Sequence, residues 1–175
     1  MPGVEVLILQ HPMETHNPKG TARLLHLSLP GSTLLTGEAF APDVLHAALH
    51  APAADGRTVR AVLLYPTDVD GPEPEALPIG AQQVRLVVLD GTWRKSRKML
   101  HVNPLLRALP RCALTDVAPS RYVIRKAHGP HQLSTLEATC AALVQLEGGQ
   151  AEKYTPLLAA MDALVAQQLV FSRCA

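Results

Sequence analysis

The feature that most constrains the fold is the apolar segment Val84–Leu89 (VRLVVL), which runs directly into Asp90 and then into a helical pattern. Further strands are predicted at Val4–Leu9, Thr33–Thr36, Arg60–Tyr65 and Ala113–Thr115, and helices at Pro42–His50, Trp93–Val102, Ser134–Glu147 and Glu152–Phe171. Near-continuous apolar strands are typical of parallel sheets that are covered on both faces. Because strands and helices alternate, the sequence predicts an α/β fold with a mainly parallel sheet flanked by helices, in a single domain spanning residues 1–175.

Local signals place several boundaries. Ser134 and Glu137 have the spacing of a capping box, in which each side chain bonds the backbone amide of the other residue. Gly148-Gly149 ends that helix, and Asn103-Pro104 ends the helix that begins at Trp93. The segment 67–80, which is rich in proline and acidic residues, is predicted as a surface loop.

Composition excludes several classes of protein. The 175 residues are 47% hydrophobic, which suffices for a core, and the net charge of +1 neither favours nor excludes a polyanionic partner. Neither a transmembrane run nor a signal peptide is predicted, so we expect a cytoplasmic protein without a membrane partner. Cys112, Cys140 and Cys174 lie far apart without a CxxC pair, which favours free thiols over a disulfide framework or a zinc site.

The segment Asp90-Gly91-Thr92-Trp93 is the first candidate site. In parallel sheets, ligands bind beyond the carboxyl ends of the strands. His11, Pro66 and Asp90 each follow a predicted strand directly, so they are expected at one edge of the sheet. Two interpretations stay open: Asp90 is a functional carboxylate beside a backbone that Gly91 leaves accessible to a ligand, or Asp90 or Thr92 only caps the next helix.

A basic stripe follows this segment. Arg94, Arg97, Lys98 and His101 share one face of the predicted helix, and no acidic residue lies between Thr92 and Val102. Such charges usually form a solvated face. Here they begin at the candidate site and oppose the helix dipole, which indicates a function such as binding a phosphate backbone.

Two further clusters carry polar groups. His11, Glu14 and Arg23 lie near the N-terminus, where they are expected to line a cleft or to bind a substrate group; metal ligation is disfavoured because no third ligand is defined. The second cluster contains Arg121, Arg125 and Lys126, followed by the helix at Thr135, whose first amides could bind an anionic group.

Several common templates are absent. The chain contains no GxGxxG segment after a strand, no P-loop and no GxSxG elbow. Aromatic residues make up 3% of the chain, so base stacking on an aromatic platform is not the expected mode of RNA binding.

Taken in order, four segments resemble the DTW-domain family, the tRNA-uridine aminocarboxypropyltransferases. They are LILQHPMETHNPKGTARLLHLSLPGS, LLYP, LDGTWRKSRKMLHVNPLLRALPR and YVIRKAHGPHQLSTLEA, and they cover roughly residues 6–147. Asp90, Thr92 and Trp93 match the motif of the family. Many members carry an N-terminal cysteine-rich zinc knuckle, which this sequence does not show before its first predicted strand; no metal is therefore expected.

The resemblance implies a SPOUT-like fold with a C-terminal trefoil knot that holds S-adenosylmethionine. It also implies that the 3-amino-3-carboxypropyl group of S-adenosylmethionine is transferred to N3 of a tRNA uridine, which gives acp3U and releases 5′-methylthioadenosine. The implied partners are tRNA and a second copy of the chain, since SPOUT relatives are often dimers.

Site roles follow from combining the resemblance with these positions. Asp90 is the expected base for uridine N3, with Thr92 and Trp93 beside it as site residues; Trp93 could equally be a core anchor. Cofactor contacts are expected at Tyr65, Pro66, Leu89, Gly91, Ser134, Thr135 and Glu137, although Glu137 could equally serve only as a cap. Contacts to tRNA are expected at His11, Glu14, Arg23, Arg94, Arg97, Lys98 and Arg125.

Alternatives remain open at this point. One is an RNA methyltransferase of the SPOUT type that uses the same cofactor, and another is a non-catalytic RNA-binding module. A ribosomal RNA substrate is also compatible with the sequence.

Overall fold

The core of the protein is a parallel sheet of five strands, with the order β2-β1-β4-β3-β5. The computed structural model describes residues 3–18, 20–66, 83–115 and 133–173. The strands are β1 (Glu5–Gln10), β2 (Thr33–Thr36), β3 (Val59–Leu64), β4 (Gln83–Asp90) and β5 (Arg111–Cys112). The helices are α1 (Ala22–Ser28), α2 (Pro42–His50), α3 (Trp93–Val102), α4 (Pro104–Arg107), α5 (Thr135–Leu146) and α6 (Thr155–Arg173), with 3₁₀ turns η1 (Pro12–Glu14) and η2 (Ala151–Tyr154).

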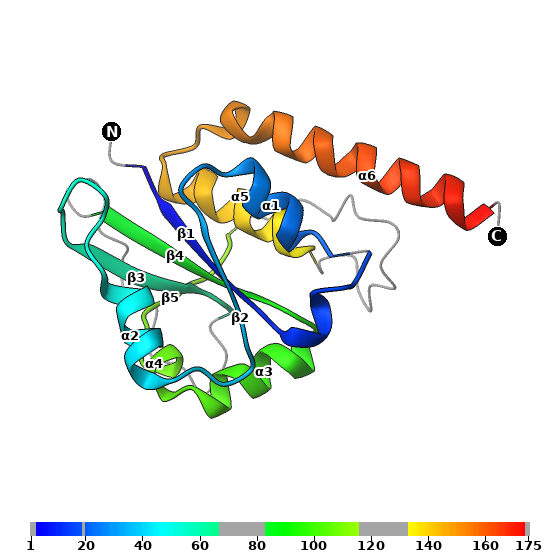
Figure 1. Cartoon of the computed structure of the whole chain (residues 1–175). Coiled ribbons are helices and arrows are strands. Elements are labelled where there is room, and N and C mark those ends of the chain that lie inside the picture. The colour runs from blue at the N-terminus through cyan, green and yellow to red at the C-terminus, as the bar shows by residue number, and fades with distance from the viewer. Residues whose placement is uncertain (1–2, 19, 67–82, 116–132, 174–175) are drawn as a thin grey trace.

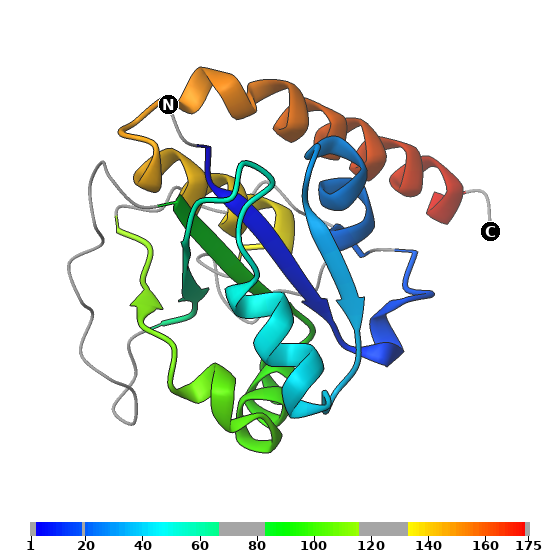
Figure 2. The same cartoon turned by 60° about the vertical axis from the view of Figure 1, so that its left-hand side comes forward.

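Helices cover both faces of the sheet, which confirms the predicted α/β class. Helices α1, α5 and α6 lie on one face, and α2, α3 and α4 lie on the other (Figure 1). In Figure 2, α2 lies in front of the strands and α5 behind them. The predicted trefoil knot stays a prediction, because residues 116–132 lie outside the described part of the chain.

The alternation of side chains along the two central strands divides the core into two clusters. Val6 and Ile8 of β1 pack on the side of α5, whereas Leu7 and Leu9 pack on the side of α3. All four side chains are at most 4% exposed. Because both faces of β1 are buried, the strand shows no polar alternation in sequence, as expected of a central parallel strand.

Most predicted elements are confirmed with small shifts in their bounds. The strand predicted at Ala113–Thr115 is wrong: β5 is the short strand Arg111–Cys112. Helix α1 was not predicted from the apolar run that it contains, and α4 begins directly at Pro104, where α3 was correctly expected to have ended. The predicted loop 67–80 lies outside the described residues. Within the described residues, no helix has the length and apolar character needed to cross a membrane.

The thiols of Cys112 and Cys140 are free and lie in the core on the side of α5. Burial raises the pKa of Cys112 to about 11 and, together with the nearby Glu137 carboxylate, raises that of Cys140 to about 12. Since the thiolate is the reactive form, both residues should resist modification at neutral pH.

We therefore expect a Cys174→Ser variant to show no rapid reaction with Ellman's reagent at pH 8. After unfolding in guanidinium chloride, both remaining thiols should react. Fast modification of the folded variant, measured by absorbance and mass spectrometry, would contradict the buried placement of these cysteines.

Candidate active site

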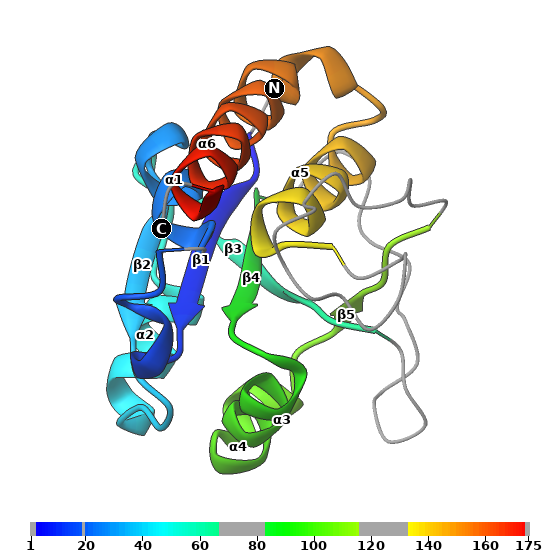
Figure 3. The same cartoon turned by 90° about the vertical axis from the view of Figure 1, so that its right-hand side faces the viewer.

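The site lies where the paths of the chain diverge at the centre of the sheet. Strands β1 and β4 are neighbours, but the chain continues from β1 to α1 on one face and from β4 to α3 on the other. Figure 3 shows η1 after the end of β1 and α3 after the end of β4. In open parallel sheets, such a point of divergence is where ligands bind, beyond the carboxyl ends of the strands.

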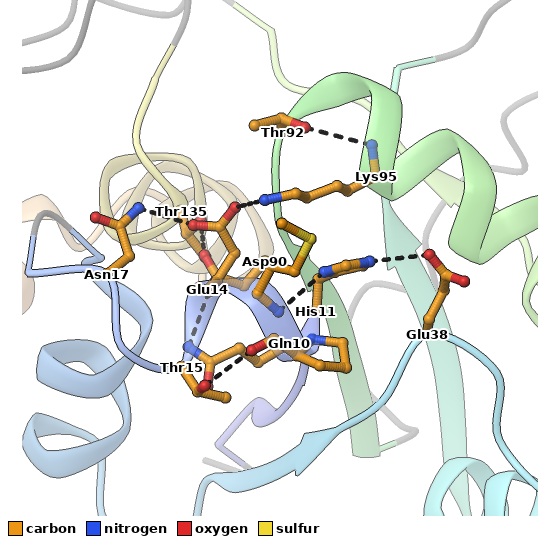
Figure 4. A network of polar contacts seen from close by, with 12 residues as sticks. Gln10, His11, Glu14, Thr15, Asn17, Glu38, Asp90, Thr92, Lys95 and Thr135 are labelled. Atoms are coloured by element: carbon orange, nitrogen blue, oxygen red, sulfur yellow. Dashed lines mark hydrogen bonds and ion pairs between the residues drawn. The ribbon is translucent and has the colours of Figure 1, made fainter.

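Asp90 is the last residue of β4 and is 6% exposed. Its Oδ1 accepts a hydrogen bond from Oγ1 of Thr135 (2.7 Å), and its Oδ2 accepts one from Nε2 of Gln10 (3.0 Å) (Figure 4). Gln10 is paired with Asp90 in the ladder between β1 and β4. Both donors stabilise the ionised carboxylate and fix its orientation.

Thr135 is the first residue of α5, and a complete capping box precedes it. The amide of Ser134 donates to the Glu137 carboxylate (2.8 Å), and the amide of Glu137 donates to the Ser134 hydroxyl (3.2 Å). The amide of Leu136 donates to Oγ1 of Thr21 (3.2 Å). The expectation that the first amides of this helix are open to an anionic ligand is therefore wrong for these three groups. Contact of Ser134 and Glu137 with a cofactor stays a prediction.

The start of α3 settles which residue caps this helix. Thr92 is the N-cap, with its hydroxyl accepting from the amide of Lys95 (3.4 Å), so the capping interpretation is confirmed for Thr92. A Cβ atom on Gly91 would lie 3.2 Å from Cβ of Lys95 and 3.5 Å from Cβ of His11. The close approach at Gly91 is therefore made by the protein's own segments.

Trp93 is 49% exposed, so its interpretation as a core anchor is wrong. Its ring meets Tyr65 edge to face, with 5.8 Å between the ring centroids. The guanidinium carbon of the buried Arg111 lies 5.1 Å from the centroid of the same tyrosine ring. Sequence analysis missed Arg111, since it lies in a short strand without a motif. These residues form an aromatic surface near the ends of β3, β4 and β5.

Ion pairs join α3 to the segments that follow β1 and β2. Nζ of Lys95 lies 2.7 Å from Oε1 of Glu14, and both side chains are largely buried. Glu38 is shared: its Oε2 lies 2.9 Å from Nε2 of His11, and its Oε1 lies 2.9 Å from Nζ of Lys98. Lys95 and Glu38 were not predicted as site residues, because the partners are far apart in sequence. His11 and Glu14 thus have contacts within the protein, and a role in binding tRNA stays a prediction.

The basic residues of α3 therefore separate into two groups. Arg94, Arg97 and His101 are exposed on one face and, within the described part of the chain, form no ion pair. Lys98 pairs with Glu38, so its interpretation as an uncompensated charge is wrong. Arg23 is exposed on α1, while Arg125 lies outside the described residues, as do its neighbours in the second basic cluster. The described residues contain no group of three or more His, Cys, Asp or Glu side chains arranged to hold a metal.

Comparison with known proteins identifies the class. Residues 2–169 match the family model of the DTW domain, so the chain belongs to the DTW-domain family. It is 34% identical over 145 residues to "tRNA-uridine aminocarboxypropyltransferase 2" of Drosophila melanogaster, a match that covers 82% of this chain and 56% of the relative. It is 30% identical over 165 residues to the mouse protein of the same name, covering 93% and 54%. The chain thus spans about half the length of these curated relatives. No solved structure matches the sequence.

The shared carboxylate of Glu38 predicts a pH dependence of stability. Hydrogen bonds from Lys98, and then from His11, hold the pKa of Glu38 below its ordinary value of 4.5. A depressed pKa in the folded state means that the stabilisation is present above about pH 4.5 and is lost as the pH falls below it.

We expect Glu38→Gln to lower the free energy of unfolding at pH 7 and to differ little from the wild type near pH 3, as measured by urea denaturation. Glu152→Gln is the matched control, because Glu152 is exposed in η2. An equal loss for Glu38→Gln at both pH values would contradict the ion-pair assignment.

Proposed function

We propose that this protein transfers the 3-amino-3-carboxypropyl group of S-adenosylmethionine to N3 of a tRNA uridine. The observation that carries the proposal is the placement of Asp90, the first residue of the DTW motif, as a clamped carboxylate at the point of divergence of the sheet. Membership of the DTW-domain family and similarity to proteins named as tRNA-uridine aminocarboxypropyltransferases support it.

The side chains around Asp90 suit this donor. The Asp90 carboxylate has a charge opposite to that of the sulfonium and of the ammonium of the amino acid part. Half-exposed Trp93, in contact with Tyr65, offers a flat apolar surface against which a purine or pyrimidine base can pack. Pro66, Leu89 and Gly91 adjoin these residues in sequence and complete the proposed cofactor pocket, with the start of α5 at Ser134, Thr135 and Glu137 as its other wall.

The main task of the protein is to deprotonate and orient the nucleophile. S-Adenosylmethionine supplies a γ-carbon that its sulfonium already activates. Asp90 accepts the proton of uridine N3, which is a poor nucleophile while protonated. The nitrogen lone pair then bonds to the γ-carbon, the carbon–sulfur bond breaks with its electrons remaining on sulfur, and 5′-methylthioadenosine leaves. Positioning by the rigid strand end makes this carbon, and not the methyl group, the site of attack.

The proposed tRNA contact is the outer face of α3. Arg94 and Arg97 project from this face near the aromatic surface, where they can contact the phosphates on either side of a bound uridine. Lys98 contributes less, because Glu38 already compensates its charge. Arg23 and Arg125 are proposed to extend the contact.

We expect Asp90→Asn to fold and to bind S-adenosylmethionine but to lose about 10²- to 10⁴-fold in transfer, because the amide cannot accept the N3 proton. The amide can still accept from Gln10, and the Thr135 hydroxyl can turn to become an acceptor. Mass spectrometry of tRNA nucleosides for acp3U, with assay of methylthioadenosine, measures the loss. Asp162→Asn, on the exposed side of α6, is the control. Wild-type yield of acp3U from Asp90→Asn would exclude this residue as the base, and S-adenosylhomocysteine as the product would indicate methylation instead.

We expect the Arg94→Ala/Arg97→Ala double variant to weaken tRNA binding and to reduce the slope of log K against log salt by about 1.5 to 2, since each lost phosphate contact releases fewer counterions. Arg57→Ala is the matched control, because Arg57 precedes β3 at the opposite edge of the sheet and pairs with Asp55. Filter binding over a range of salt concentrations measures both variants. An unchanged slope in the double variant would remove α3 from the tRNA interface.

A further inference from the structure

Gln10 is a buried polar side chain at the centre of the site that no motif singled out. It is the last residue of β1 and is 7% exposed. Because a carboxylate only accepts hydrogen bonds, the group that faces Oδ2 of Asp90 must be the amide nitrogen of Gln10, at 3.0 Å. The orientation of the glutamine amide is therefore fixed by Asp90, and that of Asp90 by the glutamine.

The backbone around this contact is held on both sides. The carbonyl of Gln10 accepts from the amide of Gly37 (3.0 Å), which extends the β1–β2 ladder past the end of β2. The amide of His11 donates to the carbonyl of Asp90 (2.9 Å), which extends the β1–β4 ladder in the same way. The Gln10 side chain thus projects from one of the most constrained points of the sheet.

The two oxygens of Asp90 lie in different surroundings. The contact of Oδ2 with Gln10 is buried, whereas the contact of Oδ1 with Thr135 is only partly buried. A hydroxyl such as that of Thr135 can rotate, while the amide of Gln10 is planar and comes from a strand. Gln10 therefore anchors the inner oxygen and leaves the lone pairs of the outer oxygen directed to the open side.

We propose that Gln10 is a positioning residue for the transfer: it orients the Asp90 carboxylate so that Oδ1 faces uridine N3. The proposal rests on the proposed function, in which Asp90 is the base. A misplaced base affects the chemical step more than binding, so loss of the Gln10 amide lowers kcat and leaves KM for both substrates almost unchanged.

The test compares Gln10→Ala and Gln10→Glu with Gln83→Ala. Gln83 is the matched control, since it is also 7% exposed but begins β4, where its amide donates to the carbonyl of Gly3 (2.9 Å) at the opposite edge of the sheet. We expect Gln10→Ala to lower kcat about 10²-fold and Gln83→Ala to retain wild-type kcat. Circular dichroism confirms that each variant is folded.

Gln10→Glu provides a readout that does not need turnover. It places a second carboxylate against Asp90, and such a pair retains one proton to higher pH, so the titration of Asp90 should move up by about one pH unit or more. Carbon-13 NMR of the aspartate carboxyls follows it directly. The other charged or titratable groups around Asp90 are His11 and Glu14 of the η1 segment, Lys95 of α3 and Glu137 of α5, and the variant leaves all of them in place.

The outcomes separate the two proposals. Reduced kcat in Gln10→Ala together with the shifted titration in Gln10→Glu supports the positioning role. A kcat in Gln10→Ala within twofold of that of Gln83→Ala, or an Asp90 titration in Gln10→Glu equal to that of the wild type, overturns it. If the wild-type protein forms no methylthioadenosine, the proposed function fails, and the NMR titration alone then decides whether Gln10 holds Asp90.

Discussion

The pairing of β1 with β4 is the interaction on which the rest of the site depends. Register places Gln10 beside Asp90, and the same ladder places η1 next to the start of α3. Because side chains alternate along a strand, a slip by one residue would turn the Asp90 carboxylate away from α5 and toward the layer that contains α3. The apolar contacts on both faces of these strands fix the register. Stability of the core and geometry of the site therefore have one cause.

Much of the fold could be predicted from the sequence because its signals are local. Apolar runs, proline and glycine boundaries and the capping box at Ser134 each act over a few residues, and the structure confirms them with small shifts. Prediction failed where the local signal is weak. Strand β5 has two residues, one of them a buried arginine, and it is a strand only because β3 pairs with it. Helix α1 is short, and its N-cap Thr21 makes no side-chain cap.

The candidate site was predicted only in part, for a related reason. Asp90 follows a strand and begins a recognisable motif, so its position could be found from sequence. Its partners Gln10 and Thr135 lie 80 and 45 residues away and could be assigned only from the three-dimensional structure. The same holds for Glu38 and Lys95. Exposure of Trp93 was also not predictable, because an aromatic residue at the start of a helix is as compatible with a core position as with a surface one.

The charges of α3 give an independent argument for an anionic ligand. A helix N-terminus disfavours positive charge, yet the first turns of α3 contain Arg94, Lys95, Arg97 and Lys98. The two lysines are compensated by carboxylates from other segments, Glu14 for Lys95 and Glu38 for Lys98. The two arginines have no such partner among the described residues. Arginine forms bidentate contacts with phosphate more readily than lysine does, so the residues left facing outward are the type that suits a nucleic-acid backbone. Compensation inside and exposure outside together explain why so basic a segment adjoins the carboxylate of Asp90.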